Sequence, residues 1–189
     1  MTHSHRDGVD QITLVAADRP GILSAVSGAL AMHGVSILRG AIHTKSTGQA
    51  IDVLTVTRTE QAEAPWDAIC SQVARTVDGD VAVDESCLNR DMVRPRGARV
   101  PTSVYVDNDS SSQFTKVEVN ASDRVGVLFA IARAIASLGL DIHLAQVDTY
   151  GTTTVDTFYL RHADGTRVES ASDVAALRRE ISGAIDRLS

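Results

Sequence analysis

Two copies of one sequence pattern make up most of the chain, and this internal repeat constrains the fold more than any other feature. The first copy covers residues 12–57 and the second covers residues 117–161. Each contains the motif Asp-Arg-x-Gly, at residues 18–21 and at residues 123–126. The 189 residues suffice for one ordinary domain or for two small ones. The repeat favours two related units joined by a connection.

Both copies predict the same order of secondary structure. Val117, Val119 and Ala121 alternate with polar residues, which is typical of a strand with one solvated face. Apolar residues then recur at helical spacing, namely at Leu23, Val26, Leu30, Leu128, Ile131, Ile135 and Leu138. Two paired strands follow in each copy, expected over residues 35–44, 50–57, 140–149 and 154–160. A second amphipathic helix closes each copy, with apolar stripes from Trp66 to Val77 and from Val174 to Leu188.

A fourth strand is expected to complete each sheet, from a different direction in each copy. In the first copy Val81 and Val83 alternate with polar residues, so we expect a strand over residues 80–85, after the second helix. In the second copy a strand is expected upstream, over residues 103–107. The predicted fold class is α+β, with two ferredoxin-like βαββαβ units, each an antiparallel four-stranded sheet with helices on one face.

These elements divide the chain into four parts. We expect residues 1–10 to be a flexible N-terminus, residues 11–88 to form the first domain and residues 103–189 to form the second. Residues 89–102 contain two prolines, a glycine and four arginines, a composition typical of a linker.

Charge and apolar content argue against several classes of protein. A net charge of −6 does not suit a nucleic-acid-binding protein, which needs a basic face. No apolar run reaches the roughly 18–20 residues of a membrane span, and no signal peptide is visible. Two cysteines are too few for a disulfide framework. We therefore expect a cytoplasmic protein with neither a nucleic acid nor a membrane as its partner.

The connection between the first strand and the first helix is the candidate binding site in each copy. Gly21 and Gly126 let another group approach the backbone, and the N–H groups at a helix start favour a carboxylate or a phosphate. The carboxylate of Asp18 or Asp123 suits an ammonium group, so together these groups fit a free amino acid. The alternative is structural: the aspartate caps the helix, and the glycine permits tight packing between helix and sheet.

No constellation of residues points to catalysis. The six histidines are scattered, and the glycine-containing loops lack the phosphate-binding pattern G-x-x-x-x-G-K-[ST]. We therefore expect no catalytic residue, no metal site and no cofactor. Asp52 and Asp156 fall inside predicted strands, where they either bond across the boundary between the copies or lie in solvent.

The two copies resemble the ACT domain family. The resemblance rests on Asp-Arg-Pro-Gly-Ile-Leu and Gly-Val-Ser-Ile in the first copy, and on Asp-Arg-Val-Gly-Val-Leu, Gly-Leu-Asp-Ile-His and Val-Asp-Thr-Phe-Tyr in the second. Residues 104–119 and 148–159 are also similar to the C-terminal half of bacterial PII uridylyltransferase/uridylyl-removing enzymes. Val125 departs from the proline usual at this position, which makes the second loop less rigid.

This resemblance implies a regulatory function. ACT domains pair side by side and bind an amino acid between them, and in the PII-modifying enzymes the tandem pair is expected to sense glutamine. The positions that the resemblance implies as ligand-binding are Asp18, Arg19, Gly21, Ile22, Leu23, Ala41, His43, Asp123, Arg124, Gly126, Val127, Leu128, Ala145 and Val147. The implied partners are an amino-acid effector, with glutamine favoured, another ACT unit in the chain or in a homodimer, and the PII protein through a parent enzyme.

Two functions follow from these observations. The first is a tandem ACT module that binds an amino acid between its units and controls a nitrogen-metabolism enzyme such as PII uridylyltransferase. The second is a stand-alone ACT-repeat protein whose open sheet faces mediate dimerisation or contact another protein. In both cases the chain is expected to be regulatory rather than an enzyme, and titration with amino acids distinguishes the two.

Overall fold

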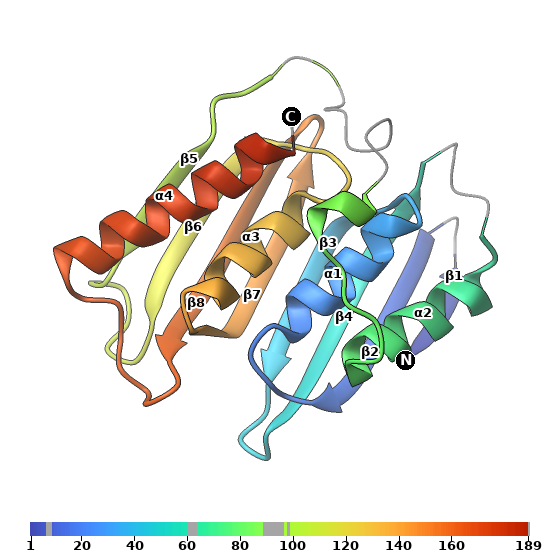
Figure 1. Cartoon of the computed structure of the whole chain (residues 1–189), viewed down its shortest axis with the longest axis horizontal. Coiled ribbons are helices and arrows are strands. Elements are labelled where there is room, and N and C mark those ends of the chain that lie inside the picture. The colour runs from blue at the N-terminus through green and yellow to red at the C-terminus, as the bar shows by residue number, and fades with distance from the viewer. Residues whose placement is uncertain (7–8, 60–63, 89–96, 98, 189) are drawn as a thin grey trace.

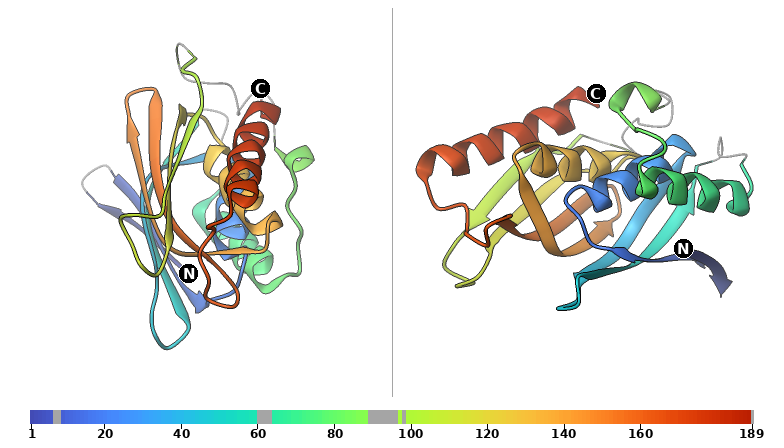
Figure 2. Two further views of the ribbon diagram at one scale, coloured as in Figure 1. Left: turned by 90° about the vertical axis from the view of Figure 1, so that its left-hand side faces the viewer. Right: turned by 60° about the horizontal axis from the view of Figure 1, so that its bottom comes forward.

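The chain forms an antiparallel sheet that is covered on one face by helices (Figures 1 and 2). A computed structural model describes residues 1–6, 9–59, 64–88, 97 and 99–188. The strands are β1 (Thr2–Arg6), β2 (Val9–Ala17), β3 (Val35–Thr44), β4 (Gln49–Arg58), β5 (Ser103–Asp107), β6 (Thr115–Ser122), β7 (Leu140–Tyr150) and β8 (Thr153–His162). The helices are α1 (Ile22–Met32), α2 (Trp66–Asp78), α3 (Val127–Ser137) and α4 (Ala171–Arg187), with a 3-10 turn over Glu85–Cys87.

The order of the strands shows two half-sheets joined edge to edge. The order is β1-β2-β4-β3-β7-β8-β6-β5, so each copy of the repeat supplies four neighbouring strands. At the junction β3 and β7 pair antiparallel, from Arg39 opposite Asp148 to His43 opposite Leu144. On the covered face α1 lies beside α3 (Figure 1). The α+β class with two ferredoxin-like units is confirmed, and the two units meet along this junction, which we call the seam.

The patterns that predicted these elements have the expected physical basis. β6 buries Val117, Val119 and Ala121 against the helices and exposes the alternate side chains more. Gly34 and Gly139, just beyond the first helix of each unit, have φ angles of 67° and 70°. This left-handed conformation favours glycine, so both positions end their helices as the sequence predicts.

The fourth strand of the first unit comes from the N-terminus instead of from residues 80–85. Residues 81–84 form no strand, and a 3-10 turn follows them. β1 occupies the edge beside β2, with Thr2 opposite Thr13, although we expected residues 1–10 to be flexible. The ring of His3 also stacks on Trp66 of α2, with 4.1 Å between ring centroids. Because β1 fills the edge position, no place beside β2 remains for a strand after α2.

The second unit has its fourth strand where it was expected, since β5 pairs with β6 from Ser103 opposite Asn120 to Asp107 opposite Lys116. Both units therefore follow the order ββαββα along the chain. Residues 89–96 and 98 of the expected linker lie outside the described residues.

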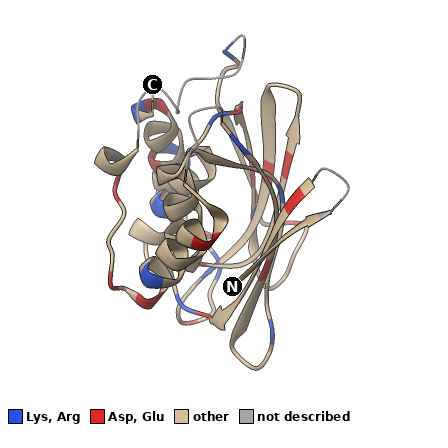
Figure 3. Ribbon diagram, turned by 90° about the vertical axis from the view of Figure 1, so that its right-hand side faces the viewer, with Lys and Arg blue, Asp and Glu red and all other residues tan. Residues whose placement is uncertain are grey.

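The two faces of the sheet differ in character. The covered face holds the core, which includes the fully buried rings of Phe129 and Phe158. The open face leaves apolar side chains in solvent, with Val15 50%, Tyr105 58% and Leu144 36% exposed. In the view of Figure 3, basic and acidic positions are interspersed, and several acidic ones lie on strands. Among the described helices, none combines the length and the apolar composition that a membrane span requires.

Candidate functional site

The residues before α1 and α3 are glycines, so neither N-cap residue supplies a capping side chain. Gly21 and Gly126 are the residues before the helices, with φ angles of 84° and 88°. The Asp18 carboxylate does not cap α1 but accepts a hydrogen bond of 2.8 Å from the Thr44 hydroxyl. The capping alternative therefore does not hold for α1, and its positive end remains suited to an anion.

The arginines of the repeated motif hold the far end of the second helix in each unit. Arg19 donates a hydrogen bond to the carbonyl of Val77 in the last turn of α2. Arg124 donates a bond of 2.7 Å to the carbonyl of Ile185 in the last turn of α4. A guanidinium stabilises a helix C-terminus because it donates hydrogen bonds to the free carbonyl groups there and because its positive charge interacts favourably with the helix dipole. The resemblance implied that these arginines bind the ligand, whereas the structure gives both of them a helix-end partner.

Two small pockets lie where the loop of one unit meets the other unit across the seam. The first seam pocket is lined by Asp18, Arg19, Gly21, Ile22, Leu23, Ile42, Thr44, Ala50, Ala136, Leu140, Asp141 and Ile142. The second seam pocket is lined by Ser27, Val35, Ser36, Ile37, Arg124, Gly126, Val127, Leu128 and Phe129. Each has a volume of about 10 Å³, which is room for a single water molecule.

The loop residues line the seam pockets, whereas the four residues expected on the facing strand lie in the paired middle of the seam, outside both pockets. Ala41 and His43 are exposed on the open face, while Ala145 and Val147 are buried beneath the helices. None of the four lines a seam pocket.

The facing wall instead comes from the first residues of β7 and β3, which include Asp141 and Ser36. β3 and β7 pair antiparallel through their middle residues, so the start of β3 and the start of β7 lie at opposite ends of the seam. Each strand start therefore lies next to the loop of the other unit. Ser36 and Asp141 each stand two places after the glycine that ends the first helix of their unit, and this position in the sequence could have predicted both.

Two buried carboxyl groups, Asp52 of β4 and Asp156 of β8, lie below the loops. Each is 0% exposed, so both lie on the covered side of the sheet and not in solvent or at the open face. Burial raises the pKa of each to about 7, and the charge of Asp18 adds to this effect at Asp52. In Asp156 one carboxyl oxygen accepts a 2.6 Å bond from the Thr154 hydroxyl.

Asp141 adds a further carboxyl group to the first seam pocket. It is half-buried, and burial raises its pKa, with a second contribution from the charge of Asp18. Carboxyl groups that repel one another in a partly buried site are stabilised in their charged form by a cation. The first seam pocket therefore offers helix N–H groups for an anion beside carboxylates for an ammonium group.

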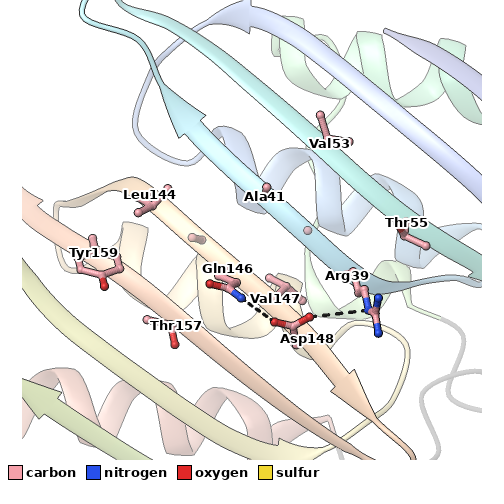
Figure 4. A pocket seen from close by; sticks show the side chains of 12 residues that line it. Arg39, Ala41, Val53, Thr55, Leu144, Gln146, Val147, Asp148, Thr157 and Tyr159 are labelled. Carbon is pink, nitrogen blue, oxygen red and sulfur yellow. Dashed lines mark hydrogen bonds and ion pairs between the residues drawn. The ribbon is translucent and has the colours of Figure 1, made fainter.

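A larger groove crosses the seam on the open face of the sheet, with a volume of about 430 Å³ (Figure 4). The Arg39 guanidinium lies 3.8 Å from the Asp148 carboxylate, and the Gln146 amide donates a 2.9 Å bond to the same carboxylate. Ala41 lines this groove on the open face, and Ala145 and Val147 also border it although their side chains are buried on the covered face.

Metal chemistry finds no support among the described residues, because no three His, Cys, Asp or Glu side chains there are placed to hold an ion. The rings of His43 and His143 are 6.3 Å apart between centroids. Cys70 is half-buried on α2 and Cys87 is exposed, and both are free thiols.

Comparison with known protein families matches both halves of the chain to ACT-type domains. Residues 11–65 match the ACT domain, and residues 111–186 match the ACT-like domain of plant bHLH transcription factors. The chain therefore carries two units of ACT type, one matched by each model. The crystal structure of aspartate kinase from Synechocystis is similar to it with a TM-score of 0.50 and 19% identity, covering 95% of this chain and 27% of that one. That likeness shows the fold alone.

Bifunctional uridylyltransferase/uridylyl-removing enzymes are similar to this ACT chain over nearly all its length. The enzyme from Rhodospirillum rubrum is 33% identical over 184 residues, and the one from Gluconobacter oxydans is 33% identical over 182 residues. These matches cover 94% and 92% of this chain, but 20% and 19% of the relatives. The chain thus spans about one-fifth of the length of these relatives and is homologous to their C-terminal regulatory region.

Proposed function

We propose that this chain is a regulatory module that binds an amino acid at the seam between its two ACT units. The observation that carries the proposal is the uncapped start of α1, which faces the Asp141 carboxyl group of the other unit across the first seam pocket. The helix N–H groups suit the carboxylate of an amino acid, and the aspartates suit its ammonium group.

Binding at the seam would couple the ligand to the packing of the two units. A pocket of about 10 Å³ is too small for any amino acid, so the units must move apart locally to admit one. A ligand shifts such an equilibrium by its difference in affinity for the two arrangements. Couplings of this kind are typically worth about 1–3 kcal/mol, enough to change an attached activity several-fold or more.

The regulated activity in this proposal is that of a uridylyltransferase/uridylyl-removing enzyme acting on the PII protein. The similarity to such enzymes over more than nine-tenths of this chain supports it. Glutamine is the effector that the family resemblance of the sequence implies. We propose a role in nitrogen regulation on this ground.

Isothermal titration calorimetry of the full chain with the twenty protein amino acids tests this function. We expect L-glutamine to bind with a micromolar to millimolar dissociation constant. Gly21→Ala should weaken binding at least tenfold, because alanine strains the left-handed conformation before α1. Gly79→Ala is the matched control, since Gly79 also has a positive φ (89°) but ends α2 away from the seam pockets. If none of the twenty binds, the sensing function is wrong.

A protein-interaction module is the second candidate, and the exposed apolar side chains of the open face favour it. Val15, Leu144 and the groove of Figure 4 form a surface that another chain could cover. A dimer in analytical ultracentrifugation that Leu144→Glu dissociates, without binding of any amino acid, would support this candidate over the first.

A further inference from the structure

The two seam pockets have different side chains at corresponding positions. Residues 105 apart correspond up to the end of β3 and β7, as Asp18 and Asp123 show, and residues 104 apart correspond in β4 and β8, as Asp52 and Asp156 show. The third residue of α1 is Ser24, whereas the third residue of α3 is Phe129. Across the seam, the first pocket has Asp141 where the second has Ser36. The repeat has therefore kept the loops but changed the groups that a ligand would touch.

The second seam pocket is lined by an aromatic ring from its own helix. Phe129 lines that pocket and is 1% exposed. It packs against Gly28 of α1 so closely that a Cβ atom at Gly28 would lie 2.8 Å from the ring. Because Gly28 has no side chain, the Phe129 ring packs directly against α1, and α1 and α3 are in close contact at this end of the seam.

A buried carboxyl group whose hydrogen bonds are not made within the described structure lies next to residues that line the first seam pocket. Both oxygens of Asp52 lack a hydrogen-bond partner there, although the residue is 0% exposed. Asp52 lies opposite Ile42 in the neighbouring strand and two residues from Ala50, and both of these line the first pocket. In the second unit the place of Ala50 is taken by Thr154, whose hydroxyl bonds to Asp156. A buried polar group without a partner is costly, so it points to a ligand that supplies one.

We propose that the two seam pockets have diverged, so that the first binds one effector molecule through its ammonium group at Asp141 and Asp52, while the second is a closed joint held by Phe129. This inference rests on the proposed function and makes it specific. The effector is an α-amino acid with a free amino group, and the chain binds one molecule of it. On binding, the two units would separate at the end of the seam that holds the first pocket. They would stay in contact at the other end, where Phe129 packs against Gly28.

Calorimetry with L-glutamine on the full chain tests the divergence, with N-acetyl-L-glutamine as the probe that lacks the ammonium group. We expect one molecule of glutamine per chain and at least tenfold weaker binding of the acetylated probe. Asp141→Asn should weaken glutamine binding at least tenfold, because the amide keeps the shape but removes the charge. Ser36→Ala is the matched control at the corresponding position, and it should change the affinity less than twofold. Thermal unfolding of both variants shows that they fold.

The possible results separate this inference from the function on which it rests. Two molecules of glutamine per chain, or equal losses in Asp141→Asn and Ser36→Ala, would overturn the divergence while leaving the sensing function intact. Unweakened binding of glutamine to Asp141→Asn, or of N-acetyl-L-glutamine to the original chain, would overturn the assignment of the ammonium site. If neither glutamine nor any other amino acid binds, both the inference and the sensing function are wrong.

Discussion

Asp52 carries a buried carboxyl group beside the residues that line the first seam pocket. It is fully buried, and its pKa is raised to about 7 mainly by burial and further by Asp18. In the unfolded chain it would titrate near its ordinary pKa of 3.8. The folded state therefore holds the proton more tightly between about pH 4 and pH 7, and its stability falls as the pH rises through this range.

Replacing Asp52 by asparagine tests this relation between stability and pH. Above pH 7 the charged carboxylate is buried, so Asp52→Asn should raise the free energy of unfolding by about 1–3 kcal/mol at pH 8. At pH 4 the unfolded chain also holds much of the proton, so the difference should be much smaller. Urea unfolding at the two pH values measures this, with exposed Asp109→Asn as the control. An equal effect of Asp52→Asn at both pH values would contradict it.

The elements of this fold were predictable wherever a local pattern decides the structure. The glycines that end the first helices, the alternation in β6 and the upstream strand β5 were all found from the sequence. The sequence did not show that β1 would occupy the edge beside β2 in place of residues 80–85, because residues 2–6 (THSHR) carry no apolar alternation and only residues 80–85 have a strand-like pattern. Competition for a sheet edge is decided by tertiary contacts such as His3 on Trp66.

The candidate site was predictable in its loops but not in its facing wall. The motif located Gly21 and Gly126 because glycine before a helix has a local meaning. Which residues of the other unit face these loops depends on the register between β3 and β7, which no local pattern records. For this reason Ala41 and His43 were expected at the seam and lie on the open face, while Asp141 was missed.

The arginines of the motif belong to the helix ends, and their replacement should show it. Arg124→Ala should lower the free energy of unfolding by about 1–3 kcal/mol, because Arg124 is 5% exposed and its loss leaves the Ile185 carbonyl without this donor. Arg19→Ala should cost less, since Arg19 is exposed. Urea unfolding measures both changes, and calorimetry should find the affinity of Arg124→Ala for glutamine altered less than twofold, because Arg124 lines the second pocket and not the first. A tenfold loss of affinity with unchanged stability would instead place these arginines in the ligand site.

At the scale of the whole molecule, the seam is where a small ligand can act on a large structure. β3 pairs with β7 and α1 lies beside α3, so any group admitted between a loop and the facing strand must shift one unit against the other. The continuous sheet limits this motion at the strands, which leaves the helix layer as the part that opens. Such a change in packing is what a catalytic region joined to this chain would detect.

The measurement that tests the central claim most directly is an amide chemical-shift titration of the ¹⁵N-labelled chain with L-glutamine. A ligand carboxylate at the start of α1 should shift the N–H signals of Leu23 and Ser24, which lie in the first turn of that helix. The matching signals of Leu128 and Phe129 in α3 should move much less, because the proposal makes the pocket lined by Phe129 a closed joint. Shifts confined to the groove around Gln146 on the open face, or equal shifts at both helix starts, would contradict the claim.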